Sequence, residues 1–236
     1  MTTPGFRDDG FYLALDTSGP VGYVAVSRGA EVLARARMER QGKHAARIVP
    51  TIDAVLTEAG LEIGGLAGIV VGEGPGSFTG VRVAAATAKG LARALDVPLW
   101  ALSSLAAAAV GDLGAGGPGV RYVLFDARAD RVYGACYGVG SRGVETILPP
   151  YASDLRAILG SDVPLGALFA GDGAERHRSA IEGSGYGLLA PPVGDPTADG
   201  LLHLMALHPE TLPTESLELW EPRYAKASNA EREWKV

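Results

Sequence analysis

The sequence predicts an α/β fold of two similar lobes, because two stretches of the chain show the same order of elements: strand, strand, strand, helix, strand, helix. Each stretch also carries an aspartate where its first strand ends, Asp16 in the first and Asp126 in the second. The glycine-rich run Gly111–Gly119 lies between them and is typical of a hinge. We therefore expect an N-terminal lobe over residues 1–110 and a C-terminal lobe over residues 111–236.

Hydrophobic periodicity predicts the elements of the first half. Alternating residues indicate antiparallel strands joined by turns, whereas apolar residues at helical spacing from Ile48 to Ala59 indicate a helix that ends at Gly60. We expect Pro50 to bend the first turn of that helix. A continuous apolar run then indicates a buried strand. In chain order, the expected elements are strands at 11–16, 21–27 and 31–37, a helix through 48–59, a strand at 67–71, a helix over 79–95 and a strand at 97–102.

The second half repeats this order. Three strand-like stretches joined by short turns predict another antiparallel meander, and the turn Gly171-Asp172-Gly173 opens a final helix. The expected elements are strands at 121–126, 131–137 and 144–148, a helix near 153–159, a strand at 165–170 and a helix through about residue 181.

Composition predicts a folded protein of the cytoplasm. Hydrophobic residues make up 47 % of the 236 residues, which is enough for a sizeable core. The longest apolar runs fall far short of the roughly 20 residues that a membrane-spanning helix needs, and the N-terminal residues lack the pattern of a secretion signal. Cys136 is the only cysteine, which excludes an internal disulfide and a thiolate metal cluster. The formal net charge of −6 disfavours tight nucleic-acid binding by this chain alone.

The doubled order of elements is similar to that of actin, the sugar kinases and the heat-shock ATPases, whose actin-like (ASKHA, RNase H-like) lobes flank a cleft. In that superfamily, aspartates at the first hairpin of each lobe face phosphates and magnesium. The alternative is an ordinary mixed α/β protein whose halves are alike by chance. The pattern of elements alone leaves both interpretations open.

The most informative stretch is the glycine-rich loop Gly74-Pro75-Gly76-Ser77-Phe78-Thr79-Gly80, which continues into the alanine-rich helix. Its glycines can take positive φ, and the helix has little bulk on its first turns. This stretch resembles the TsaB family, also called YeaZ, and its larger paralogue TsaD. The likeness extends along most of the chain, through Leu13–Ser18, His44, Ser103–Leu105, Asp126–Arg128 with Val132-Tyr133, Gly171–Ala174 and Pro222–Tyr224.

Two positions favour TsaB over TsaD. TsaD-like enzymes place two histidines four residues apart just after the strand that follows the alanine-rich helix, as a pair of metal ligands. This sequence has Ser104 and Ala108 there, and neither can replace an imidazole. The chain is also much shorter than a TsaD-like protein. We therefore expect no catalytic residue and no metal ligand in this chain.

The resemblance implies a scaffold subunit of the complex that forms N6-threonylcarbamoyladenosine next to the anticodon of tRNAs that read codons starting with A. The implied partners are a TsaD-like catalytic subunit and a TsaE-like ATPase, with a homodimer when the chain is alone. ATP and metal are expected in the partner subunits, and tRNA is contacted only indirectly. The alternatives are a divergent ATPase or a glycoprotease-like peptidase of the same fold, and a plain tRNA-binding protein, which the acidic balance disfavours.

Six residues correspond to phosphate or nucleotide positions of the superfamily, and we interpret them as vestigial here. Asp16 is equally suited to cap a turn, and the turn at residues 171–173 is equally suited to start a helix. Arg128, beside the second aspartate, would obstruct a nucleotide. The six residues are Asp16, Thr17, Ser18, Asp126, Gly171 and Gly173.

A contact surface with a second molecule is predicted on the first two helices. Small residues on an exposed helix face permit close packing with a partner helix. The alternative is that the alanine face packs inside its own lobe. None of the four histidines has the spacing of a metal site, and the histidine at the head of the first helix is interpreted as an interface or capping residue. The predicted interface residues are His44, Arg47, Ile48, Thr51, Arg82, Ala85, Ala86 and Lys89.

Overall fold

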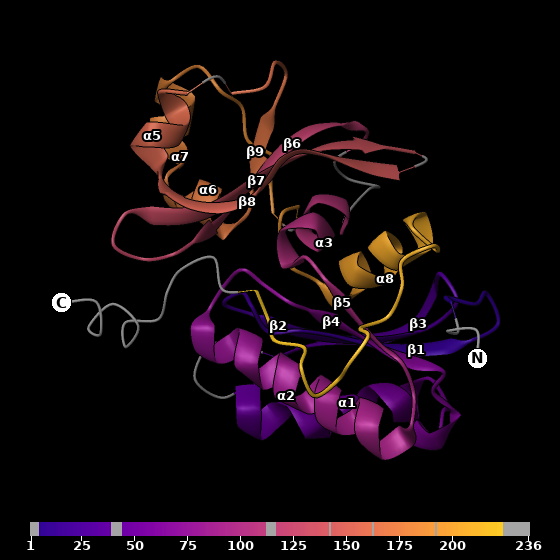
Figure 1. The fold of residues 1–236 in the computed structure, drawn as a ribbon. Coiled ribbons are helices and arrows are strands. Elements are labelled where there is room, and N and C mark those ends of the chain that lie inside the picture. The colour runs from indigo at the N-terminus through magenta and orange to yellow at the C-terminus, as the bar shows by residue number, and fades with distance from the viewer. Residues whose placement is uncertain are drawn as a thin grey trace.

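The computed structural model describes residues 5–38, 44–111, 117–141, 143–161, 163–191 and 193–223. These residues form two mixed β-sheets, one in each half of the chain, with helices on the outer face of each sheet and two helices between the sheets (Figure 1). Each half shows the predicted order βββαβα. The chain therefore has the α/β architecture of the actin-like (ASKHA, RNase H-like) fold.

The first sheet has the strand order β3-β2-β1-β4-β5. The strand β1 (Phe11–Asp16) pairs antiparallel with β2 (Gly22–Arg28), which pairs antiparallel with β3 (Glu31–Met38). On the other side, β4 (Gly68–Gly72) runs parallel to β1, and β5 (Leu99–Leu102) runs parallel to β4. The carboxyl ends of β1, β4 and β5 therefore meet at one edge of the sheet.

Two helices cover the outer face of this sheet, α1 (His44–Glu58) and α2 (Phe78–Leu95). The Ser77 hydroxyl caps the first turn of α2 by accepting a hydrogen bond from the Gly80 amide (3.3 Å), and Asp96 ends the helix in the left-handed conformation. The alanines of α2 and the aliphatic residues of α1 form one core with the outward side chains of the strands. Alanines allow α2 to lie close to the sheet, because a methyl group needs little space.

The second sheet has the strand order β8-β7-β6-β9, with the first three strands in an antiparallel meander and the last parallel to β6. Its strands are β6 (Gly119–Asp126), β7 (Arg131–Gly140), β8 (Gly143–Asp154) and β9 (Leu168–Ala170). Three short helices complete the half: α5 (Leu155–Leu159), α6 (Asp172–Arg176) and α7 (Arg178–Gly183).

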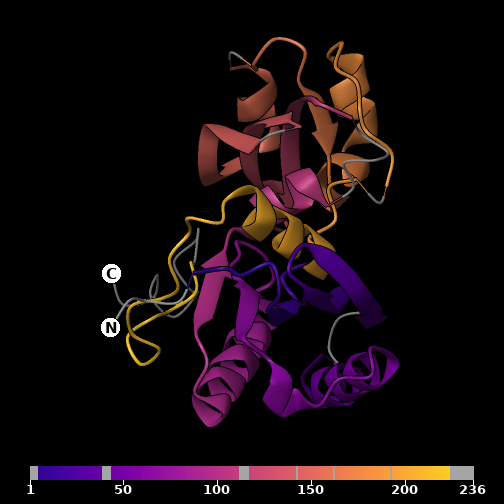
Figure 2. The ribbon, with the colours of Figure 1, turned by 90° about the vertical axis from the view of Figure 1, so that its right-hand side faces the viewer.

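The helices α3 (Ser104–Val110) and α8 (Ala198–Leu207) lie between the two sheets (Figure 2). Every residue of α3 is buried, because the helix contacts α8, β6 and β7. α8 in turn contacts β1 and β4. The sequence prediction missed both helices. The run Ala106–Ala109 has no polar side, so it gives no helical period, and a helix surrounded by protein on all sides needs none.

Two further expectations differ from the structure or lie outside it. The final helix of the second half is two helices, α6 and α7, which meet at His177, whose φ of −108° and ψ of 19° are not helical. Pro50 lies inside α1 at an exposed position. Residues 112–116 of the predicted hinge lie outside the described residues.

Among the helices that are described, none has the length and apolar character that a bilayer crossing needs.

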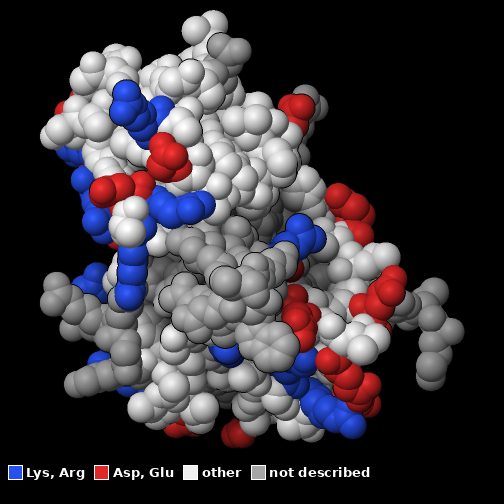
Figure 3. All heavy atoms as spheres, turned by 60° about the vertical axis from the view of Figure 1, so that its left-hand side comes forward, with Lys and Arg blue, Asp and Glu red and all other residues white. Residues whose placement is uncertain are grey.

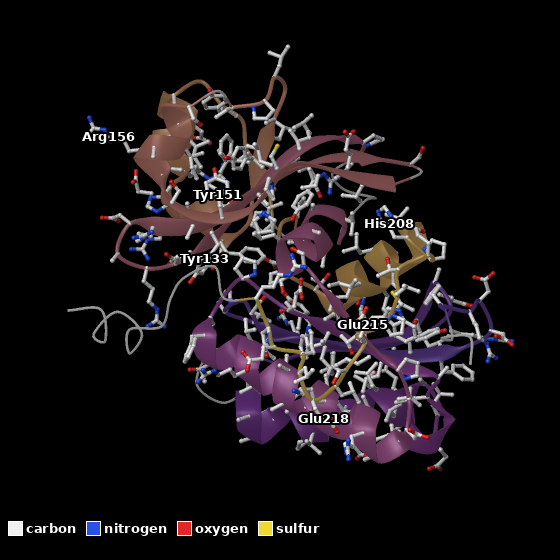
Figure 4. The ribbon with its side chains drawn as sticks, viewed as in Figure 1. Tyr133, Tyr151, Arg156, His208, Glu215 and Glu218 are labelled. Atoms are coloured by element: carbon white, nitrogen blue, oxygen red, sulfur yellow. The ribbon has the colours of Figure 1, made fainter. Side chains whose placement is uncertain are left out.

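The C-terminal segment (residues 208–223) returns to the first sheet after α8. The Thr214 amide donates a hydrogen bond to the Leu99 carbonyl of the edge strand β5 (2.8 Å). Figure 4 labels His208, Glu215 and Glu218 along the path from the layer of α8, past the sheet, to the layer of α2. The predicted division at residues 110 and 111 remains a prediction, since this part of the second half packs on the first.

Candidate functional site

The side chain of Asp16 ends β1 inside the protein, with an exposed fraction of 0 %. Its Oδ1 accepts hydrogen bonds from the Ser18 amide (2.7 Å) and the Ser18 hydroxyl (2.6 Å), and its Oδ2 accepts one from the Ser104 hydroxyl (2.7 Å). Burial raises the pKa of Asp16 to about 6, and these three donors oppose that rise. The carboxyl group is thus held by the protein's own groups at the predicted phosphate position.

The glycine-rich loop is packed directly on the residues that follow β1. The Thr17 hydroxyl donates a hydrogen bond to the Gly80 carbonyl (2.6 Å), and the Ser77 amide donates one to the Ser18 carbonyl (2.7 Å). A Cβ atom on Gly76 would lie 2.6 Å from the Ser18 Cβ, which is closer than side chains can approach. The loop therefore needs glycine for close packing, and Thr17 and Ser18 are buried beneath it.

Both positions where TsaD-like enzymes carry histidines are buried in α3. The Ser104 hydroxyl accepts a hydrogen bond from the Gly74 amide (3.1 Å) while it donates to Asp16, so it joins the glycine-rich loop to β1. Ala108 has an exposed fraction of 0 %. These two residues serve packing and loop anchoring.

The predicted nucleotide position Asp126 in the second half also makes hydrogen bonds and an ion pair within the protein. Asp126 pairs with Arg176 (2.6 Å) and accepts a hydrogen bond from the Arg128 amide (2.8 Å). The Asp126 amide donates to Asp172 (3.1 Å), whose pKa is raised to about 6 by burial and by the carboxylates of Asp126 and Asp195.

The two glycines of this turn have packing roles. Gly171 takes a φ of 97°, which glycine adopts readily, and a Cβ on Gly173 would lie 2.8 Å from the Phe125 carbonyl carbon. They let the start of α6 approach β6. Their role in nucleotide binding, like that of the four polar positions, remains a prediction.

The predicted interface residues do not share one exposed side. His44, Ile48 and Ala85 are buried, so the expectation that Ala85 lies on an exposed helix face is wrong. Burial also lowers the pKa of His44. Arg47 is exposed and Thr51 is half-buried, with its hydroxyl donating to the Arg47 carbonyl (2.8 Å).

On α2, Arg82 and Ala86 are exposed and line a hollow of about 390 Å³ between the starts of α1 and α2. Ala45 and Phe78 line it too, and the guanidinium carbon of Arg82 lies 3.8 Å from the centroid of the Phe78 ring. Val49, one turn after Ala45, is 63 % exposed. We call Ala45, Val49, Phe78, Arg82 and Ala86 the docking face.

Sequence reasoning missed three members of the docking face, Ala45, Val49 and Phe78. A signal was present for Phe78 alone, because an aromatic residue in the first turn of a helix is a candidate for exposure, whereas Val49 stands between Ile48 and Pro50 and gives no such contrast. Lys89, the remaining predicted residue, donates hydrogen bonds to the carbonyls of Glu218 (3.3 Å) and Trp220 (3.0 Å) in the C-terminal segment. It therefore holds a part of its own chain.

Comparisons with known proteins agree with this architecture. The family described as "TsaD: tRNA N6-adenosine threonylcarbamoyltransferase" matches residues 38–185. The tRNA threonylcarbamoyladenosine biosynthesis protein TsaB of Bacillus subtilis is 33 % identical over 174 residues, which cover 72 % of this chain and 74 % of that protein.

Solved structures give the same result. YeaZ from Pseudomonas aeruginosa has a TM-score of 0.75 and 29 % identity, covering 91 % of this chain and 99 % of that chain. Component A of (R)-2-hydroxyglutaryl-CoA dehydratase from Acidaminococcus fermentans, with a TM-score of 0.50 and 12 % identity over 84 % of this chain and 96 % of that one, shares the fold alone. From these matches and its own glycine-rich loop, the chain belongs to the TsaB (YeaZ) family of tRNA threonylcarbamoyladenosine biosynthesis proteins.

Proposed function

We propose that this chain is the non-catalytic scaffold subunit of the complex that makes N6-threonylcarbamoyladenosine in tRNA. The match to a tRNA threonylcarbamoyladenosine biosynthesis protein and to the TsaD family model supports this proposal. The finer roles are proposals: pairing with a TsaD-like catalytic subunit, support by a TsaE-like ATPase, and a homodimer when the TsaD-like subunit is absent. ATP and metal would be bound by those partners.

The observation that carries this proposal is the burial of Ser104 and Ala108 where TsaD-like enzymes hold a metal. A metal site needs ligand atoms with lone pairs that converge on an open position. Here the hydroxyl of Ser104 is already bonded to Asp16 and Gly74, and a methyl group stands at the second position. Among the described residues, no group of three His, Cys, Asp or Glu side chains has the geometry to hold a metal ion.

The surface charge supports indirect contact with tRNA. On the described part of the face shown in Figure 3, basic side chains gather along the left edge with acidic ones among them, and both signs occur at the right. Tight binding to an RNA backbone comes from several Lys and Arg side chains that neutralise phosphates together. With a net charge of −6, the chain is better suited to meet a protein partner than an RNA.

Ala86→Glu should abolish most of the binding to a TsaD-like subunit. Ala86 is exposed on the docking face, so a glutamate there brings bulk and charge into the contact without entering the core. We expect the dissociation constant to rise by about 100-fold, since the glutamate fills the hollow and its carboxylate loses water in the contact, a cost that the neighbouring Arg82 offsets only in part. The measurement is titration of the purified TsaD-like subunit by calorimetry, supported by co-purification.

Ala94→Glu is the matched control for this experiment. It places the same side chain on the same helix at another exposed position, outside the docking face. Both variants should keep the wild-type melting temperature. Ala85→Glu is unsuitable, because Ala85 is buried with an exposed fraction of 5 % and the variant would lose stability. Equal binding by the Ala86 and Ala94 variants would contradict the proposed face.

The purified chain should bind Mg–ATP too weakly to give a saturable signal. Asp16 and Thr17 are covered by the glycine-rich loop, and Asp126 is paired with Arg176. Calorimetric titration of Mg–ATP into the isolated chain, with hydrolysis followed in parallel, checks this expectation. Saturable binding with turnover would instead support the divergent ATPase, and cleavage of a glycoprotein substrate would support the peptidase.

A further inference from the structure

The helix α2 carries one stripe of residues along its length that is open at one end and covered at the other. Phe78, Arg82, Ala86, Lys89 and Arg93 follow one another at intervals of three or four residues, so they lie on one side of the helix. Phe78, Arg82 and Ala86 belong to the docking face, whereas Lys89 and Arg93 contact the C-terminal segment. The C-terminal segment therefore continues the surface on which the docking face lies.

A turn of the C-terminal segment sits on this covered half. The Trp220 amide donates to the Ser216 carbonyl (3.0 Å), and the Leu219 amide donates to the Ser216 hydroxyl (3.3 Å). Lys89 Nζ donates hydrogen bonds to the carbonyls of Glu218 and Trp220, the two residues that flank Leu219. The position of Leu219 is thereby fixed from both sides.

The end of the segment is anchored to Glu73, the residue before the glycine-rich loop. The Arg223 amide donates to the Glu73 carbonyl (3.0 Å), and Arg223 Nε lies 2.9 Å from the Glu73 carboxylate. Glu73 is 8 % exposed, its pKa is raised by burial, and the side chain of Trp220 also donates to it. This explains why the sequence carries Pro222-Arg223 near its end: Arg223 closes the turn against a buried carboxylate.

Leu219 itself points into solvent, with an exposed fraction of 83 %. A leucine on a mobile tail loses entropy when it binds, whereas one that is already held loses little. The polar contacts around residues 216–223 thus present an apolar side chain in a fixed position beside the docking face. Leu219 belongs to none of the hydrophobic clusters formed by the described residues, so packing among them does not account for its position.

The docking face alone is too small for a stable interface with a partner protein. From Phe78 to Ala86 the helix rises about 12 Å, and two adjacent helices are about 20 Å wide, which gives a projected area of roughly 240 Å². Stable specific interfaces bury about 800 Å² on each partner. A partner seated on the docking face must therefore extend beyond Ala86, and the turn at residues 216–220 is the next surface along α2.

We propose that the turn at residues 216–220 is part of the binding surface for the TsaD-like subunit and that Leu219 inserts into an apolar depression on that partner. The inference rests on the proposed function, because it adds a contact to the same face. Lys89 and Arg223 are positioning residues that hold the turn. Arg93 is paired with the Glu218 carboxylate, and the Lys89 ammonium donates to two backbone carbonyls, so both side chains are engaged within the chain beside the apolar tip.

Leu219→Asp tests the proposal, with Leu212→Asp as its matched control. Leu212 lies on the same segment and is 73 % exposed, but it sits between Thr211 and Thr214, which are bonded to Trp100 and β5. We expect Leu219→Asp to weaken binding of the TsaD-like subunit by about tenfold and Leu212→Asp to change it less than twofold. Both variants should melt at the wild-type temperature, because neither side chain is packed.

Lys89→Met releases the turn without changing its apolar tip. We expect a loss of binding smaller than that of Leu219→Asp, and no further loss when the two are combined, since both act through one contact. If Ala86→Glu weakens binding and Leu219→Asp does not, the further inference is overturned and the proposed function stands. If neither variant weakens binding, the proposed function fails as well. A loss confined to the homodimer would assign Leu219 to a second copy and overturn the inference.

Discussion

Replacing Gly72 with alanine should lower the free energy of unfolding by about 4 kcal/mol, which is a large fraction of the stability of a typical domain. A Cβ atom at this position would lie 2.6 Å from the carboxyl carbon of Asp16 and 2.7 Å from Ser104 Oγ. Neither neighbour can move aside, because the Ser104 hydroxyl donates a hydrogen bond to the Asp16 carboxylate. The same hydroxyl also accepts a hydrogen bond from the Gly74 amide. The added methyl group would therefore overpack the end of β4 and at the same time break the buried hydrogen bonds of Ser104.

Gly90→Ala is the control that separates crowding from a general effect of glycine. Gly90 lies in α2, and a Cβ there meets nothing within 4 Å. Alanine is a better helix residue than glycine, so this variant should gain roughly 0.5 to 1 kcal/mol. Urea unfolding followed by circular dichroism measures both changes. A Gly72 variant as stable as wild type would show that β1 and β4 can separate at this point.

The sequence alone predicted the sheets well and the packing sides of α2 poorly. The strands have alternating or continuous apolar patterns, and the glycine-rich loop carries a specific resemblance. An alanine-rich helix has no such contrast between its sides. Ala85 and Ala86 are identical in chemistry and adjacent in sequence, yet one is buried and the other lines a hollow. Only the neighbouring elements decide which alanine faces the core.

The contacts of the C-terminal segment could not be predicted from the sequence, for a different reason. Its contacts are between residues far apart, such as Glu73 with Arg223 and Lys89 with Trp220. Ion pairs and bonds to carbonyls leave no periodic trace in a single sequence. The motif Pro222-Arg223 was visible, but its partner was not, because any of several acidic residues could have received the arginine.

The stability of the protein should fall as the pH rises from about 4 to about 6, and Asp16→Asn should remove a large part of that fall. Burial raises the pKa of Asp16 to about 6 in the folded protein, against 3.8 for an ordinary aspartate. Between these pH values the folded chain keeps a proton that the unfolded chain releases, so folding is favoured at the acidic end of the window. One pKa unit corresponds to about 1.4 kcal/mol, so the loss across the window is roughly 3 kcal/mol.

Asparagine suits this site because it stays neutral at every pH. Its oxygen can accept from the Ser18 amide and hydroxyl, and its amide can donate to Ser104. We expect Asp16→Asn to be no more stable than wild type near pH 4 and more stable near pH 7.5, measured by urea unfolding. Asp53→Asn, at an exposed position on α1, controls for the loss of a surface charge. If wild type and Asp16→Asn keep the same difference at both pH values, the three donors outweigh burial and Asp16 is ionised throughout.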